Sequence, residues 1–168
     1  MIEIKTDRLI LKKPKSKQDI LSIVSQIGDW EVVKWLAMVP YPYTYNDCES
    51  YLKESNNNEL ALNIFLDNQL IGGVGLHLHN DNYYELGYWL GKDYWGKGYA
   101  TESSKYLLEY ALGKLDSPKI KSGYFIDNLP SGNVLKKLGF KERAKALFTP
   151  KKKIQENKKK TITRKPPV

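Results

Sequence analysis

The feature that most constrains this chain is a glycine-rich turn between a strand-like and a helix-like segment. Residues 84–90 have the character of a strand, residues 99–115 that of a helix, and Gly96 and Gly98 flank Lys97 between them. Glycine allows unusual backbone angles and close approach of a ligand to main-chain amides. The first turn of the helix adds unpaired N–H groups and the positive end of the helix dipole. Together these features predict a cradle for the phosphates of a cofactor.

The spacing of this turn differs from two common nucleotide motifs. The chain has no Gly-x-Gly-x-x-Gly dinucleotide fingerprint, and Lys97 is followed by Gly98 and not by the Ser or Thr of a nucleotide-triphosphate loop. A turn that only caps a helix is the alternative interpretation of an isolated Gly-x-Gly. Longer blocks of sequence favour the interpretation as a cofactor-binding turn.

Two blocks resemble the acetyl-CoA-binding core of the GNAT acetyltransferase superfamily. Residues 85–90 and 94–102 form the first block. Residues 128–140 form the second, which is similar to the Asn-x-x-Ser…Leu-Gly-Phe motif of the branch that includes ribosomal-protein N-terminal acetyltransferases (RimJ/RimL-like). Residues 6–11 and 39–43 also look like this branch, so the resemblance covers about residues 6–143. Two features depart from it: Trp95 stands where the superfamily usually has Gln or Arg, and residues 144–168 are lysine-rich where members usually finish with two apolar strands.

The resemblance implies an α+β fold with a mixed, mostly antiparallel central sheet that is flanked by helices and splayed between its fourth and fifth strands. The residue pattern predicts strands at 8–11, 60–66, 69–79, 84–90 and 119–126, and helices at 17–27, 30–36, 47–54, 99–115 and 128–138. Hairpin turns are expected at residues 67–68 and 81–82, and a left-handed helix end at Gly139.

The length of 168 residues fits one domain, residues 1–168. The net charge of +8 lies entirely in residues 145–168, which carry nine Lys and Arg against one acid. The other 144 residues carry eighteen basic and eighteen acidic side chains. We interpret residues 145–168 as a solvated, partly disordered end. Attraction of an acidic substrate or of the ribosome surface is the functional alternative.

Several classes of function fit this sequence poorly. A nucleic-acid-binding domain would spread basic residues over its folded face, so no direct nucleic-acid partner is expected. No apolar run reaches the length of a membrane span, and the N-terminus lacks the shape of a signal peptide. One cysteine, Cys48, and two histidines give no metal cluster at ligand spacing. We therefore expect a cytoplasmic monomer or homodimer that uses acetyl-CoA as co-substrate, and neither a metal nor a membrane.

The resemblance assigns acetyl-CoA to three groups of residues. The glycine turn provides main-chain amides for the pyrophosphate, the fourth strand provides main-chain groups for the acetyl-pantetheine arm, and the helix after the fifth strand provides side chains. The residues of the glycine turn are Trp95, Gly96, Lys97, Gly98, Tyr99, Ala100 and Thr101. Those of the fourth strand are Tyr88, Trp89 and Leu90, and those of the helix are Asn128, Ser131 and Lys137.

Ser131 and Glu85 are the catalytic candidates. With Asn128 as N-cap, Ser131 is the third helical residue and its hydroxyl lies at the positive helix end, where it would stabilise a departing thiolate. Capping the helix is its alternative role. Glu85 would act as base, directly or through a water, unless it is only a solvent-facing strand residue. His77 and His79 share one strand face, but they lie near a hairpin end, where exposure is expected.

Four aromatic residues, together with Glu85, are candidates for contact with the acceptor: Trp35, Tyr41, Tyr43 and Tyr124. The residues between the first helices shape the acceptor pocket in this family, and Tyr124 belongs to the predicted fifth strand. A role in the core is the alternative for each of the four.

The acceptor implied by the resemblance is a protein N-terminal α-amine, such as that of a ribosomal protein. An α-amine of pKa about 7.7–8.0 is roughly one-tenth neutral at pH 7, whereas a lysine near 10.4 is neutral in under about one molecule per thousand. A weak base such as Glu85 therefore suits an α-amine. The alternatives are a small amine (an antibiotic, polyamine or amino acid) and a non-catalytic acyl-CoA-binding module. No nucleophile with an adjacent base is visible, so direct transfer in a ternary complex is expected.

Overall fold

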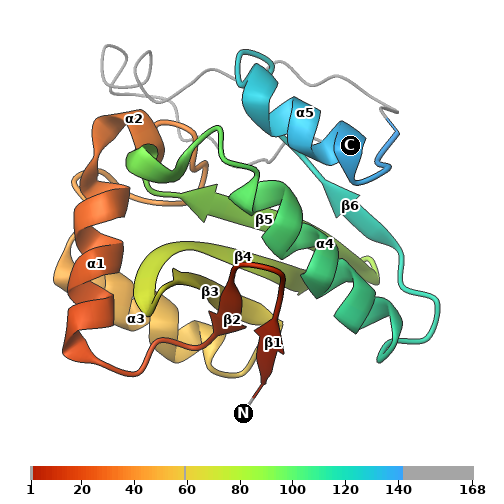
Figure 1. Cartoon of the computed structure of the whole chain (residues 1–168), viewed down its shortest axis with the longest axis horizontal. Helices are drawn as coiled ribbons and strands as arrows, with labels where there is room; N and C mark the ends of the chain where they lie inside the picture. Colours follow the sequence, from red (N-terminus) through yellow and green to blue (C-terminus); the bar gives the residue numbers. More distant parts are fainter. Residues whose placement is uncertain (1, 59, 142–168) are drawn as a thin grey trace.

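A six-stranded sheet with helices on both faces forms the protein (Figure 1), as the computed structural model of residues 2–58 and 60–141 shows. The strands follow the order of the sequence: β1 (Glu3–Lys5), β2 (Ile10–Lys12), β3 (Ala61–Leu66), β4 (Gln69–His79), β5 (Tyr83–Leu90) and β6 (Ile120–Ser122). Neighbouring strands are antiparallel except for the parallel pair β5–β6. The predicted mixed, mostly antiparallel α+β fold is thus confirmed.

Helices begin where short polar side chains cap them. The helices are α1 (Lys17–Gly28), α2 (Trp30–Val33), α3 (Tyr45–Ser55), α4 (Tyr99–Leu112) and α5 (Leu129–Lys137), and a short 3₁₀ helix spans Lys92–Tyr94. Ser16 and Asp19 form a capping box at α1, as Thr44 and Asp47 do at α3. Each box satisfies two backbone N–H groups that the first helical turn leaves unpaired.

Two apolar clusters hold the layers together, one on each face of the sheet. The first joins the sheet to α4 and α5 through residues such as Leu76, Leu107 and Leu135. The second joins it to α1, α2 and α3 through Ile27, Val33 and Cys48, among others. Successive side chains of a strand point to opposite faces, so each central strand contributes to both clusters.

The predicted turns are confirmed by the backbone. Asp67 and Asn68 both have positive φ, 47° and 66°, as a two-residue hairpin turn requires. Asn82 has a φ of 56° in the next hairpin, and Gly139 has a φ of 85° after the end of α5. These local signals therefore fix where β3, β4 and β5 begin and end.

Some predicted boundaries were wrong. β1 was not predicted, so the fourth and fifth predicted strands are β5 and β6 of the structure. β6 ends at Ser122 and not at residue 126, because the Ser122 hydroxyl donates to the Leu86 carbonyl (2.8 Å) and the strand pairing goes no further. Tyr124 consequently lies in the connection to α5. The lysine-rich residues 145–168 and the question of a last strand lie outside the described residues.

No helix in the described part of the chain is both long enough and apolar enough to span a membrane.

Gly73→Ala is expected to destabilise the fold by about 1–3 kcal/mol through overpacking. A Cβ on Gly73 would lie 2.5 Å from Nε1 of Trp89, its partner on β5, so the indole ring, which packs on the α1 face, would have to move. Gly28→Ala is the matched control, since a Cβ there meets no described atom within 4 Å outside its own helix. Urea denaturation measures both free energies of unfolding, and equal values would contradict the packing argument.

Candidate functional site

The glycine turn connects β5 to α4 and leaves the helix start open. Gly96 and Gly98 have φ values of 73° and 83°, which residues other than glycine rarely adopt. Gly98 is the N-cap of α4, and no side chain in the described part of the chain caps this helix. The other α-helices are capped by side chains, those of Ser16, Asp29, Thr44 and Asn128. The first amides of α4 therefore lack the side-chain acceptor that the other helices have, which fits an anionic ligand.

Side chains within the turn hold its shape. Trp95 donates from Nε1 to the Leu90 carbonyl at 2.9 Å, so its indole ties the turn to the end of β5. Lys97 donates from Nζ to the Asp93 carbonyl at 2.9 Å and is exposed. The ammonium group of Lys97 thus braces the turn. With the Lys97 ammonium bound to the Asp93 carbonyl, the main-chain amides of the turn remain the predicted phosphate donors.

The strands β5 and β6 separate after a short pairing (Figure 1). Their parallel register joins Tyr84, Glu85 and Leu86 to Ile120, Lys121 and Ser122 and extends no further in the described residues. β5 continues to Leu90 with β4 as its paired neighbour. The predicted splay between these two strands is consistent with this register.

Tyr88 and Ser131 meet between β5 and α5. The Tyr88 hydroxyl donates to the Ser131 carbonyl at 3.0 Å and lies 2.9 Å from Ser131 Oγ, where either oxygen can donate. Burial raises the pKa of Tyr88 to about 12, against the lowering effect of the Ser131 hydrogen bond, so the phenol keeps its proton at neutral pH. Asn128 Oδ1 accepts from the Ser131 amide at 3.2 Å, which makes Asn128 the predicted cap and Ser131 the third residue of α5.

Glu85 is a nearly buried residue held by a histidine. Its Oε2 lies 2.7 Å from His79 Nε2, and the two side chains are 12% and 37% exposed. His79 in turn stacks on the Tyr83 ring at 4.6 Å between centroids. The sequence analysis placed the histidines at an exposed hairpin end and missed this pair. The hairpin register contained the signal, because His79 opposes Tyr83 and Glu85 follows two residues later on the same face.

Comparison with known proteins identifies the family. The acetyltransferase (GNAT) domain family matches residues 8–141. The chain belongs to this family. N-acetyltransferase p20 of Bacillus licheniformis is 26% identical over 148 residues, which cover 82% of this chain and 81% of that protein. A GNAT-family acetyltransferase from Bacillus anthracis superposes with a TM-score of 0.75 at 23% identity, over 86% of each chain. RimL, a ribosomal L7/L12 α-N-protein acetyltransferase solved with coenzyme A, gives 0.74 at 16% identity, again over 86% of each chain.

The protein is therefore an acetyl-CoA-dependent N-acetyltransferase. The uncapped start of α4 and the two positive-φ glycines are features typical of anion sites at helix starts. Lys137 is exposed near the end of α5, so it remains a candidate for a peripheral phosphate contact.

In residues 2–58 and 60–141 no group of three or more His, Cys, Asp or Glu is arranged to hold a metal ion.

The aromatic candidates near α2 have two different environments. Trp35 lies 6.1 Å from Phe125 between ring centroids, so it connects the end of α2 to the β6–α5 connection. Tyr41 is 44% exposed and meets Trp30 edge-on at 5.0 Å. Tyr43 is buried in the cluster on the α1 face, which supports its alternative role in the core. Tyr41 is thus exposed, whereas Trp35 is half-buried against Phe125.

Tyr124 packs against α5. A Cβ on Gly132 would lie 2.7 Å from the Tyr124 ring, so the ring rests directly on the glycine backbone. This contact supports the packing role for Tyr124 and fixes the connection between β6 and α5.

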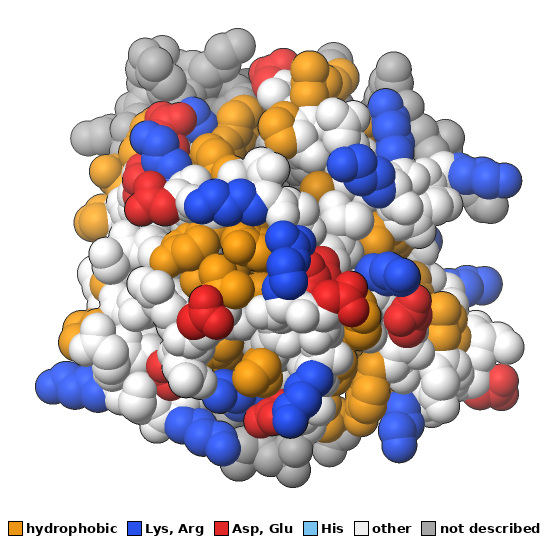
Figure 2. All heavy atoms as spheres, viewed as in Figure 1, with side chains coloured by type: hydrophobic (Ala, Val, Ile, Leu, Met, Phe, Trp, Pro, Cys, Tyr) orange, Lys and Arg blue, Asp and Glu red, His pale blue; other side chains and the backbone are white. Residues whose placement is uncertain are grey.

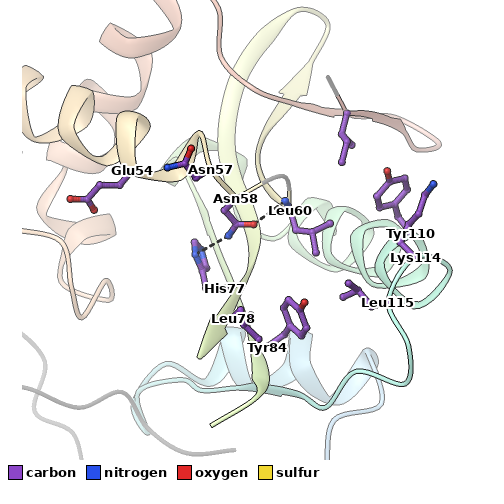
Figure 3. Close-up of a pocket in the computed structure, with 11 residues that line it drawn as sticks. Glu54, Asn57, Asn58, Leu60, His77, Leu78, Tyr84, Tyr110, Lys114 and Leu115 are labelled. Carbon is purple, nitrogen blue, oxygen red and sulfur yellow. Dashed lines mark hydrogen bonds between the residues drawn. The ribbon is translucent and has the colours of Figure 1, made fainter. Parts of the chain in front are cut away.

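A separate pocket of about 690 Å³ lies at the other end of the sheet (Figure 3). Its lining includes Tyr84 at the start of β5 and Lys114 just beyond α4, and the Asn58 amide meets His77 Nδ1 there at 3.3 Å. The glycine turn lies at the opposite end of α4, whose 14 residues span roughly 21 Å at 1.5 Å each. The pocket is therefore distinct from the acetyltransferase cradle.

Gly98→Ala is expected to weaken CoA binding by about 10-fold, because a φ of 83° costs an L-residue with a side chain roughly 1–2 kcal/mol. Gly113→Ala, at a φ of −78° after the other end of α4, serves as the control. Calorimetric titration with CoA gives both dissociation constants. Equal affinities would remove the Gly98 backbone from the cradle.

Proposed function

We propose that this enzyme transfers the acetyl group of acetyl-CoA directly to the α-amine of a protein N-terminus within a ternary complex. The observation that carries the proposal is the separation of Ser131 and Glu85 by β5. Tyr88, the partner of Ser131, packs with the cluster on the α4 and α5 face, whereas Trp89 packs on the α1 face. Glu85 lies an even number of residues from Trp89, so it points to the α1 face as well. Ser131 would thus act on the leaving thiolate from one side of β5, and Glu85 would act on the amine from the other.

Acetyl-CoA supplies an acyl group activated as a thioester, and the chain must stabilise the thiolate that departs. Ser131 lies in the first turn of α5, where the helix dipole favours negative charge. Tyr88 has one phenolic proton, which can go either to the Ser131 carbonyl or to Ser131 Oγ; in the second case the serine hydroxyl keeps its own proton for another acceptor. A hydroxyl donor held in this way is suited to a thiolate of pKa near 8.5.

The base side depends on Glu85 and His79. Tyr88 is three positions after Glu85 on the strand, roughly 10 Å away, so a proton from an amine near Tyr88 would reach Glu85 through water. The contact between His79 Nε2 and Glu85 Oε2, at 2.7 Å, keeps the Glu85 carboxylate oriented. In the proposed step the amine nitrogen forms the bond to the acyl carbon, the carbon–sulfur bond breaks, and the amine proton passes by way of water to Glu85.

An acceptor that needs little deprotonation fits this base. An α-amine is roughly one-tenth neutral at pH 7 and a lysine far less, so a water-relayed carboxylate serves the α-amine better. RimL, which has the same fold, is named for action on the N-terminus of a ribosomal protein. Large apolar side chains are exposed in the two segments that contain Trp35 and Phe125, namely Met38, Tyr41, Ile126 and Leu129. Exposed apolar groups of this kind favour a peptide as the ligand over a small polar amine.

Ser131→Ala is expected to lower kcat about 10- to 100-fold with little change in the KM for acetyl-CoA, since a hydrogen bond to a charged group contributes about 1.5–3 kcal/mol. Tyr88→Phe is expected to have a smaller effect in the same direction, because the serine hydroxyl remains but loses its orienting partner. Ser25→Ala, an exposed serine on α1, is the control. Steady-state kinetics with thiol detection separates these effects, and an unchanged kcat in Ser131→Ala would exclude Ser131 from the reaction.

The acceptor class is tested by thiol release with a panel of amines. Peptides with a free α-amine are expected to be acetylated, while the same peptides with a blocked N-terminus and an internal lysine are not. Polyamines, aminoglycosides and free amino acids complete the panel. Turnover confined to these small amines, or CoA binding without turnover on any amine, would contradict the proposed acceptor.

A further inference from the structure

Arg8, in the turn between β1 and β2, reaches the glycine turn with its whole guanidinium group. Its Nε and Nη2 both contact Glu102 Oε2 at 2.7 Å, and its Nη1 donates to the Lys97 carbonyl at 3.1 Å. The guanidinium also lies 4.6 Å from the centre of the Tyr99 ring. Figure 2 shows basic and acidic side chains side by side on the face that carries the start of α4. We propose that Arg8 is a positioning residue for acetyl-CoA, which acts through the glycine turn and through the charge of Glu102.

The first part of the argument is the direction of one peptide group. The carbonyl of residue 97 and the amide of residue 98 belong to one planar trans peptide and point in opposite directions. Because Arg8 holds the Lys97 carbonyl, the Gly98 amide points away from Arg8. Gly98 has no side chain to fix its own φ of 83°, so this contact supplies the restraint that glycine lacks.

The second part is a negative charge within the cradle helix. Glu102 is the fourth residue of α4, and its Oε1 accepts from Thr6 Oγ1 at 2.6 Å and from the Arg8 amide at 2.8 Å. Burial by itself would raise the pKa of Glu102, but the hydrogen bonds from Thr6 and Arg8 and the charge of Arg8 lower it. Glu102 is therefore ionised at neutral pH, one turn from the amides that would receive the pyrophosphate.

Arg8 and Glu102 thus depend on each other. Glu102 fastens the β1–β2 turn to α4, yet an unpaired carboxylate there would repel the phosphates of the coenzyme. Arg8 cancels that charge and keeps the helix start attractive to anions. Lysine cannot replace both contacts, since a single ammonium lacks the planar fork that meets Glu102 and Lys97 together. This inference relies on the proposed placement of the coenzyme phosphates at the glycine turn.

Arg8→Gln is expected to raise the dissociation constant for CoA about 10- to 30-fold and the KM for acetyl-CoA by a similar factor, with a much smaller effect on kcat. Arg8→Lys keeps the charge and loses the fork, so its affinity is expected between those of Arg8→Gln and the wild type. Removing the repelling carboxylate in Arg8→Gln/Glu102→Gln is expected to recover part of the lost affinity. Lys105→Gln is the control, because its pair with Glu109 on the same helix is long, at 3.9 Å, and both side chains are about 60% exposed.

Calorimetry with CoA, dephospho-CoA and pantetheine locates the effect. The same loss with CoA and dephospho-CoA, and none with pantetheine, is expected if Arg8 acts at the pyrophosphate. An equal loss with pantetheine, or unchanged CoA affinity in folded Arg8→Gln, would overturn the proposal. Arg8→Lys gives the same decision if Arg8→Gln does not fold. Wild-type protein that binds no CoA would instead refute the proposed cofactor placement, so the two failures are distinguishable.

Discussion

The three-residue pairing of β5 with β6 is the constraint on which the site depends. A parallel ladder that continued beyond Leu86 would engage the backbone polar groups of residues 87–90 on that side. The Ser122 hydroxyl donates a hydrogen bond to the Leu86 carbonyl, and the chain then leaves the sheet toward α5. This departure brings the start of α5, with Ser131, over Tyr88. The end of the ladder therefore produces both the separation of the strands and the side-chain contact next to it.

The alternation of side chains along β5 divides the chemistry between two faces. Tyr88 and Leu90 belong with the cluster under α4 and α5, while Trp89 belongs with the cluster under α1. The helix dipoles of α4 and α5 lie on the first face, where in the proposed function they would stabilise negative charge on the coenzyme and its thiolate. The carboxylate of Glu85 points to the other face, so it would not repel phosphates or a thiolate placed on the first. A one-residue shift in the register of β5 would turn Glu85 to the face on which Ser131 lies.

The features predicted from the sequence depend on residues close together in the chain, whereas the features that were missed depend on residues far apart in it. The caps at Ser16 and Asn128, the Asp67–Asn68 turn and the positive φ of Gly98 each follow from a few consecutive residues. The pairs Arg8–Glu102 and Tyr88–Ser131 join residues 94 and 43 positions apart, and nothing in either local pattern specifies the partner. The His79–Glu85 pair lies between these cases, since a known hairpin register would have placed the two side chains on one face. β6 was predicted too long because apolar residues continue past Ser122, where Phe125 is buried without being in a strand.

The charge balance of residues 1–144 gives the Arg8–Glu102 pair its importance. Residues 1–144 carry equal numbers of basic and acidic side chains, so this part of the chain has no net charge with which to attract an anionic coenzyme. In the proposed placement of the phosphates at the glycine turn, the attraction would come from oriented amides and from the few charges within about a Debye length. Glu102 is one of these charges and has the wrong sign. Its pairing with Arg8, on a turn that precedes the cradle by almost ninety residues, lets the same carboxylate fasten β1 and β2 to α4 without opposing the ligand.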